Sequence, residues 1–420
     1  MPDEVKLTVR PHMSTLPVTD SPQLTYLMIE ALPTEALAAV QMPLNFCLVL
    51  DHSGSMSGEK LDNLKAAARL AIEHMSPQDI ASVVIFDDTV KVAAPSQSVT
   101  DPATLIAQVD RMRAEGGTKI SKGMQQGLEE LAKGVEAGRV NRMLLLTDGE
   151  TYGDQDLCRK LADQAGRANV PITALGLGED WNEALLDAIA EASGGTADFV
   201  PDGEPEAILK TFEHEVRTAQ ATVIQDATLL LRLVPGAIPR AVWRVSPMIT
   251  KLGHRALSER DVQVPLGDLE REQGQSVLVE LMVAPHRPGR YRLAQAEIGY
   301  AVAALGLEDE KVRADVVLSF TQDPAAVSEA DPEVLNIVEK VTAHKLQTRA
   351  LDEAAAGNIA GATQKLRAVA TRLLNMGEED LAQTALAEAQ RLEEGEQLSS
   401  HGTKKLRYET RKLTQREERS

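Results

Sequence analysis

The stretch FCLVLDHSGSM (residues 46–56) decides the fold, because a short apolar run passes directly into a loop rich in side-chain oxygens. Residues 46–50 are continuously hydrophobic, which is typical of a strand that is buried on both faces. Strands of this kind occur in parallel sheets that helices cover on both sides. The stretch therefore predicts a parallel sheet with a polar loop at the carboxyl end of one strand.

The residues that follow alternate between strand patterns and helix patterns. Short apolar runs predict strands at 81–86, 90–94, 142–147, 170–178 and 196–200. Helical periodicity separates them, at 59–75, 102–113, 120–135, 155–169, 181–193 and 204–218. This alternation predicts an α/β fold, a doubly wound and mostly parallel sheet that spans residues 44–218.

Residues 219–322 have a different pattern, in which short β segments are broken by Pro and Gly. This pattern predicts an antiparallel β-sandwich. Residues 1–43 contain two further strand patterns, at 5–10 and 24–32, which have no place in a doubly wound sheet. We expect these strands to join the sandwich, so that the α/β domain is an insertion between strands of the sandwich.

The last part of the chain, residues 331–420, is predicted to be an α-helical C-terminal domain. Asp331 is a suitable N-cap, and Pro332 suits the first position of a helix. Gly357 and Gly377 interrupt the helical pattern. We therefore expect helices at 332–356, 358–376, 378–395 and 402–417.

Composition excludes several classes of protein. The chain has 420 residues, and 44 Lys and Arg against 63 Asp and Glu leave a net charge of −19. This charge argues against nucleic acid as a partner, because phosphate binding needs a basic surface. Residues 403–420 are a basic exception, since seven Lys or Arg and three Glu give them a charge of +4.

The chain has no pattern of a membrane or secreted protein. No apolar run approaches the ~20 residues that a membrane span requires, and the first residues lack a secretory signal. The two cysteines suit a reducing compartment, where they behave as small hydrophobic residues. We therefore expect a cytoplasmic protein without a membrane span.

Three motifs place side-chain oxygens at the predicted carboxyl ends of parallel strands. They are DHSGS (51–55), GGT (116–118) and TDG (147–149). Because loops at this edge of an open α/β sheet converge on ligand sites, we expect these side chains to lie together. Hydroxyl and carboxylate oxygens suit Mg²⁺ or Mn²⁺ better than Zn²⁺. The predicted metal ligands are Asp51, Ser53, Ser55, Thr118 and Asp148.

Residues 43–218 resemble a von Willebrand factor type A domain of bacterial type, with a metal ion-dependent adhesion site that reads Asp-x-Ser-x-Ser, then Thr, then Asp. The resemblance implies that the two serines bind Mg²⁺ directly, and that the two aspartates act directly or through water. It implies that the threonine joins or leaves the metal as the domain switches. The sixth position is left for an acidic side chain of a partner protein. Mg²⁺ is the expected cofactor, with Mn²⁺ or Ca²⁺ as alternatives.

Other polar residues are predicted near the same edge of the sheet. His52 lies inside the motif, at a position that does not bind metal in the family. Four acidic residues follow two of the predicted strands: Asp87, Asp88, Glu179 and Asp180. They either contact the metal-binding residues without binding the metal themselves, or lie in solvated loops. We favour solvated loops.

The sequence favours a non-enzymatic, Mg²⁺-dependent protein-interaction module. It contains no Gly-x-Ser-x-Gly elbow, no Walker phosphate loop and no His-Glu-x-x-His pair. A metal-dependent hydrolase is disfavoured, because no pair of nucleophile and base is visible. The alternative is an accessory subunit of an AAA+ ATPase or chelatase-type complex, or of a kinase–phosphatase signalling complex, which the resemblance also implies. The identity of the partner and the oligomeric state stay open.

Overall fold

The computed structural model describes residues 4–201 and 204–415, and contacts divide the chain into two compact units. We call Val40–Thr222 the α/β unit. Met1–Ala39 and Val223–Ser420 together make up the other unit, which we call the β/helical unit. Along the chain, the α/β unit is therefore an insertion within the β/helical unit.

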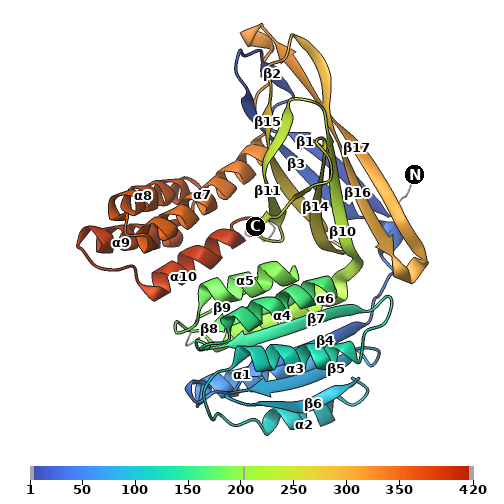
Figure 1. The fold of residues 1–420 in the computed structure, drawn as a ribbon, viewed down its shortest axis with the longest axis vertical. Coiled ribbons are helices and arrows are strands. Elements are labelled where there is room, and N and C mark those ends of the chain that lie inside the picture. Colours follow the sequence, from blue (N-terminus) through green and yellow to red (C-terminus); the bar gives the residue numbers. More distant parts are fainter. Residues whose placement is uncertain (1–3, 202–203, 416–420) are drawn as a thin grey trace. The chain divides into compact units, whose positions relative to one another are not determined.

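A six-stranded sheet forms the centre of the α/β unit, with the order β6-β5-β4-β7-β8-β9 (Figure 1). Its strands are β4 (Leu44–Asp51), β5 (Ile80–Phe86), β6 (Val90–Ser98), β7 (Val140–Thr147), β8 (Ile172–Leu177) and β9 (Ala197–Val200). Neighbouring strands from β5 to β9 are parallel, whereas β6 at one edge pairs antiparallel with β5. Every residue of β4 is buried. The predicted doubly wound, mostly parallel sheet is confirmed.

In the described part of this unit, six helices pack on the sheet. They are α1 (Glu59–Glu73), α2 (Pro102–Asp110), α3 (Ile120–Ala132), α4 (Gln155–Arg167), α5 (Glu183–Ser193) and α6 (Pro205–Ala221). Two glycines let α3 approach the sheet closely. A Cβ on Gly123 would lie 2.6 Å from the Phe86 ring, and a Cβ on Gly127 would lie 2.6 Å from Val49. The beginning of α3 is thereby held at the carboxyl ends of β4 and β5.

The β/helical unit contains two sheets. The first has the order β1-β3-β15-β11-β12, with β1 (Val5–Pro11), β3 (Gln23–Pro33), β15 (Gln275–Val283), β11 (Ala237–Ser246) and β12 (Thr250–Leu252). The second has the order β13-β14-β10-β16-β17-β2, with β13 (Arg255–Ala256), β14 (Asp261–Glu270), β10 (Thr222–Leu233), β16 (Gly289–Val302), β17 (Leu307–Thr321) and β2 (Thr15–Pro17). The sheets contact each other through β1 with β17 and through β3 with β14, so they form the predicted sandwich.

The N-terminal strands belong to this sandwich, as predicted. β3 pairs antiparallel with β1 on one side and with β15 on the other. The short strand β2 was not predicted, because three residues are too few to have a recognisable alternation. It pairs parallel with the end of β17. The α/β unit is therefore inserted between β3 and β10.

Helices α7 (Pro332–Ala355), α8 (Ile359–Asn375), α9 (Glu379–Glu393) and α10 (Ser400–Glu409) follow the sandwich. Asp331 caps α7, because its carboxylate accepts the backbone N–H groups of Glu333 and Val334 at 3.0 and 3.1 Å. The predicted helical C-terminal domain is confirmed. Short 3₁₀ turns occupy Glu35–Leu37, Gly54–Met56, Ala303–Leu305, Pro324–Ala326 and Thr410–Lys412.

Helix α10 ends before the predicted residue 417, because the chain turns toward the first sheet at its end. In the 3₁₀ turn after α10, the carbonyl oxygen of Arg411 accepts the backbone N–H of Ile249 at 2.8 Å. Predictions for residues 1–3 and 416–420, which include the end of the basic segment, lie outside the described residues.

The helices share one hydrophobic core with the first sheet. This core joins Met28, Trp243 and Leu278 of the sheet to apolar residues of α7, α8, α9 and α10. The Trp243 indole N–H donates to Glu280 at 3.0 Å, and the ammonium of Lys345 on α7 pairs with the same carboxylate. Burial of each large apolar side chain contributes about 1.5–3 kcal/mol, so this contact is a main stabilising feature of the unit.

The two cysteines, Cys47 and Cys158, are free and buried. Burial raises the pKa of each thiol to about 12, so both behave as hydrophobic residues rather than as nucleophiles. In the part of the chain that the structure describes, no helix is long and apolar enough to cross a membrane.

His344 of α7 is a buried titratable group in the core of the β/helical unit. Its Nδ1 lies 3.0 Å from the hydroxyl of Thr410, and its ring meets the Trp243 ring edge to face. Burial, together with the positive charges of Arg411 and Arg407, lowers the pKa of this imidazole to about 3. His344 is therefore neutral in the folded chain at neutral pH.

We expect His344 to make the folded chain acid-sensitive. Below pH ~6.5 the unfolded chain binds a proton here and the folded chain does not, so stability falls as the pH falls toward 3. Between pH 7 and pH 5 the loss is about 2 kcal/mol. His344→Gln can keep a hydrogen bond to Thr410 but does not titrate. Urea unfolding at both pH values, with hydrogen exchange of α7 as the local readout, should show a smaller loss in this variant. An equal loss in both proteins would contradict the prediction.

Candidate metal site

Asp51 ends the buried strand β4, and its side chain has no solvent-accessible surface. One carboxylate oxygen accepts the backbone N–H of Ser53 at 2.8 Å, and the other accepts the Thr147 hydroxyl at 2.6 Å. Burial raises the pKa of this carboxyl group to about 6, although the hydrogen bonds from Thr147 and Ser53 act in the opposite direction. The carboxylate is thus held rigidly between β4 and β7.

Three of the predicted ligand oxygens lie in direct contact. The Ser55 hydroxyl donates to Asp148 at 2.7 Å, and the Ser53 and Ser55 hydroxyl oxygens are 3.0 Å apart. Adjacent oxygens around an octahedral Mg²⁺, each 2.0–2.1 Å from the ion, are separated by about 2.9 Å. The Ser53–Ser55 and Ser55–Asp148 distances are therefore close to the spacing of adjacent ligands around one such ion.

Thr118 lies beside this group, on the loop before α3. The backbone N–H of Gly54 donates to the carbonyl oxygen of Gly116 at 3.0 Å, so this loop is bonded to the motif itself. The Thr118 hydroxyl oxygen lies 3.4 Å from the position of a Cβ on Gly149, the residue after Asp148. The structure thus brings all five predicted residues together, and their role as metal ligands stays a prediction.

Two residues at this site have contacts that were not predicted. Lys60, on the first turn of α1, forms an ion pair with Asp148 at 3.1 Å. Thr147 holds Asp51 in place through its hydroxyl group. Thr147 belongs to the TDG motif and Lys60 follows the DHSGS motif, but neither motif indicates which side chains contact the two aspartates. Lys60 and a metal ion would both be attracted to the carboxylate of Asp148.

The expectation of a solvated loop is wrong for Asp87. This residue is buried, and the backbone N–H and hydroxyl of Thr89 both donate to one of its carboxylate oxygens. Burial alone would raise the pKa of Asp87, but these hydrogen bonds and the nearby His52 hold it below its usual value. The remaining three acidic residues are exposed: Asp88, Glu179 and Asp180.

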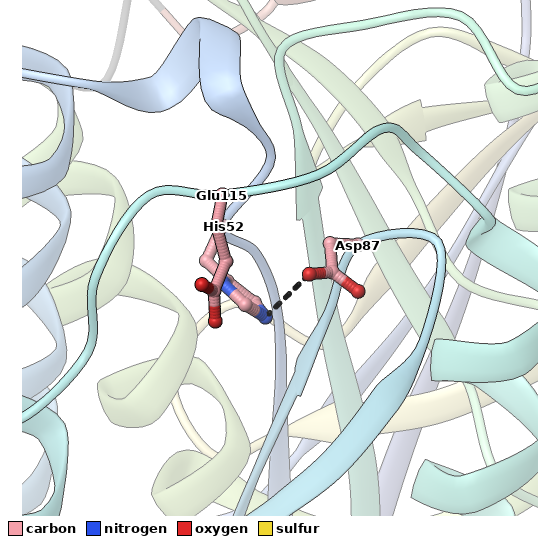
Figure 2. Close-up of side chains that lie close together, drawn as sticks. All are labelled: His52, Asp87 and Glu115. Atoms are coloured by element: carbon pink, nitrogen blue, oxygen red, sulfur yellow. Dashed lines mark ion pairs between the residues drawn. The ribbon is translucent and has the colours of Figure 1, made fainter.

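His52 does not serve the serines as a base. Its Nδ1 lies 2.8 Å from the carbonyl oxygen of Arg113, and its Nε2 is directed toward Asp87 (Figure 2). The Ser55 hydroxyl instead donates to a carboxylate. This arrangement differs from a nucleophile activated by a neighbouring imidazole.

The comparisons with known proteins agree with this fold. Residues 45–213 match the von Willebrand factor type A domain, and residues 332–416 match the Sll0103-like, C-terminal alpha-helical domain. Fold and sequence thus define a protein of the von Willebrand factor type A class. Over 377 residues, the chain is 33% identical to the uncharacterized protein sll0103 of Synechocystis, with 87% of each chain covered. The chain belongs to the family of von Willebrand factor type A proteins that includes sll0103.

Two further similarities are more distant. The chain is 27% identical to human inter-alpha-trypsin inhibitor heavy chain H4 over 198 residues, which cover 44% of this chain and 21% of that protein. A solved von Willebrand factor type A structure from Catenulispora acidiphila superposes with a TM-score of 0.79 at 19% identity, and covers 97% of this chain and 96% of that one. At this identity the likeness shows a shared fold.

We expect Lys60 to compete with a divalent cation for Asp148. Lys60→Met keeps the apolar stem but removes the ammonium group, so Mg²⁺ should bind roughly tenfold more tightly, which corresponds to about 1.4 kcal/mol. The metal-free variant should also be less stable, because the buried carboxylate loses its ion pair. Calorimetric titration with Mg²⁺ and thermal unfolding without it measure the two effects. Lys160→Met, at an exposed position on α4, is the control. Unchanged or weaker Mg²⁺ binding by Lys60→Met would refute the competition.

Proposed function

We propose that the protein is a non-enzymatic, Mg²⁺-dependent module for protein–protein interaction. The observation that carries the proposal is the contact of the Ser53, Ser55 and Asp148 oxygens at 2.7 and 3.0 Å. These hard oxygen donors suit Mg²⁺ in type as well as in spacing. Five residues would hold the ion: Asp51, Ser53, Ser55, Thr118 and Asp148.

An open position on the ion would favour an acidic partner. The two aspartates of this set formally balance a divalent ion, and five protein ligands leave one position of an octahedral Mg²⁺ for a further hard oxygen. Ser55 is exposed, whereas Asp51 and Ser53 are buried, so a partner can reach the ion from the side of Ser55. A carboxylate from a partner protein would supply the oxygen that completes the metal shell.

The family relationship supports the same kind of function at a coarser level. Homologous von Willebrand factor type A domains, such as that of inter-alpha-trypsin inhibitor heavy chain H4, suggest a protein-interaction module. The metal dependence and the acidic residue of the partner belong to this proposal. They can be tested separately.

We expect Ser55→Ala to weaken Mg²⁺ binding at least tenfold, because it removes one oxygen ligand without changing the charge of the site. Ser57→Ala is a matched control, since Ser57 is an exposed serine of the same loop. Isothermal titration with Mg²⁺ measures both affinities. Asp51→Ala should abolish binding. The metal hypothesis fails if wild type and Asp51→Ala give the same heats.

We expect partner binding to require both the ion and Ser55. The immobilised protein should retain a partner from an extract of the native organism in Mg²⁺ and release it in EDTA. Ser57→Ala should retain the same partner and Ser55→Ala should not. Replacement of one acidic residue of the partner by its amide should abolish binding to the wild type. Retention that is equal in EDTA, or equal for both variants, would contradict the proposed function.

A further inference from the structure

A second group of metal-ligating side chains lies next to the candidate Mg²⁺ site. His52, Asp87 and Glu115 each offer one ligand atom, and these atoms all lie within 4.8 Å of one another (Figure 2). The three residues come from three different loops, after β4, after β5 and before α3. His52 and Asp87 are 5% and 6% exposed, whereas Glu115 is exposed. The group is therefore closed on one side and open to water on the other.

The imidazole of His52 is oriented as metal-binding histidines are. A carbonyl oxygen can only accept a hydrogen bond, so Nδ1, 2.8 Å from the carbonyl oxygen of Arg113, carries the hydrogen. The lone pair of the neutral ring then lies on Nε2, which faces the carboxylate of Asp87 at 3.9 Å. Metal-binding histidines commonly donate their other N–H to such a carbonyl group, which fixes the tautomer and the ring.

Asp87 presents one oxygen to the same space. Thr89 occupies one carboxylate oxygen, and the other faces Nε2 of His52. The separation of 3.9 Å is too long for a hydrogen bond between the two groups. Two electron-pair donors that face each other in a buried place are unfavourable unless a proton or a metal ion lies between them. Ligands around a tetrahedral Zn²⁺ are separated by about 3.3 Å, so a small movement would bring both atoms to one ion.

The loop that contains Gly116 passes over this space. Gly116 has a φ of +73°, and a Cβ at this position would lie 2.8 Å from the Asp87 oxygen that faces His52. Any side chain here would collide with the proposed ligand oxygen. The backbone N–H of the preceding residue, Glu115, donates to the carbonyl oxygen of His52 at 2.8 Å. This hydrogen bond holds the backbone of Glu115 beside that of His52.

We propose that His52, Asp87 and Glu115 form a second metal site, which takes a transition metal of the Zn²⁺ type rather than Mg²⁺. An imidazole nitrogen with two carboxylate oxygens is a ligand set that suits Zn²⁺, and the open side leaves its fourth position to water. This chemistry differs from the all-oxygen set of the neighbouring site. A cation here would fasten the loop that carries Thr118 to the motif that carries Ser53 and Ser55.

Zn²⁺ itself is the probe that tests this site. The full chain, freed of metal and then saturated with Mg²⁺, should bind one Zn²⁺ by calorimetry at this site. Co²⁺ in place of Zn²⁺ should give the visible absorption of a low-coordinate nitrogen and oxygen site. Glu115→Gln should weaken Zn²⁺ binding at least tenfold, and His52→Gln should abolish it. Asp88→Asn, a change in the exposed neighbour of Asp87, should leave Zn²⁺ binding unchanged.

A further variant separates this proposal from the proposed function. Ser55→Ala should lose Mg²⁺ binding but keep Zn²⁺ binding, because Ser55 is not part of the second site. Since Glu115 is exposed, Glu115→Gln should fold normally even if His52→Gln does not. Absence of Zn²⁺ binding to the wild type in Mg²⁺ would overturn the proposal. So would equal Zn²⁺ binding by wild type and Glu115→Gln, or loss of Zn²⁺ binding in Ser55→Ala.

Discussion

Two buried carboxylates at the ends of adjacent parallel strands are the constraint on which the site depends. Asp51 ends β4 and Asp148 follows β7, and they are 0% and 2% exposed. Burial and the proximity of Asp148 both raise the pKa of Asp51, because like charges away from water are unfavourable. The surrounding structure offsets this cost with N–H and hydroxyl donors and with the Lys60 ammonium. Under the proposed function, a bound divalent ion would offset this cost more completely.

The sequence predicted those parts of the structure that depend on local pattern. The run before Asp51 predicted a buried strand, and the order of the motifs predicted which loops would meet, because parallel strands end at one edge. Contacts between distant residues were beyond such patterns. Lys60 pairs with a residue 88 positions away, and Asp87 is buried because the loop through Gly116 passes over it. Neither contact produces a periodic pattern of residues in the sequence.

In the C-terminal helices, too, local patterns were predicted and contacts between distant residues were not. Its helices were predicted because Gly residues and an Asp-Pro cap mark their ends. An amphipathic pattern indicates that one face of a helix is buried but not which surface covers it. Trp243 and Met28 of the first sheet supply that surface, and Lys345 of α7 pairs with Glu280 of the sheet. The helices are therefore part of the core of the β/helical unit.

Net charge and local chemistry lead to different expectations about partners. A chain of charge −19 should attract basic surfaces and repel acidic ones at long range. Within a few ångströms a bound cation reverses this preference, because its field is strong where water is excluded. Long-range repulsion of an acidic partner slows association, while the direct bond to the metal opposes dissociation. An acidic partner of such a site is therefore selected mainly by its contact with the ion and its shape, rather than by the overall field of the protein.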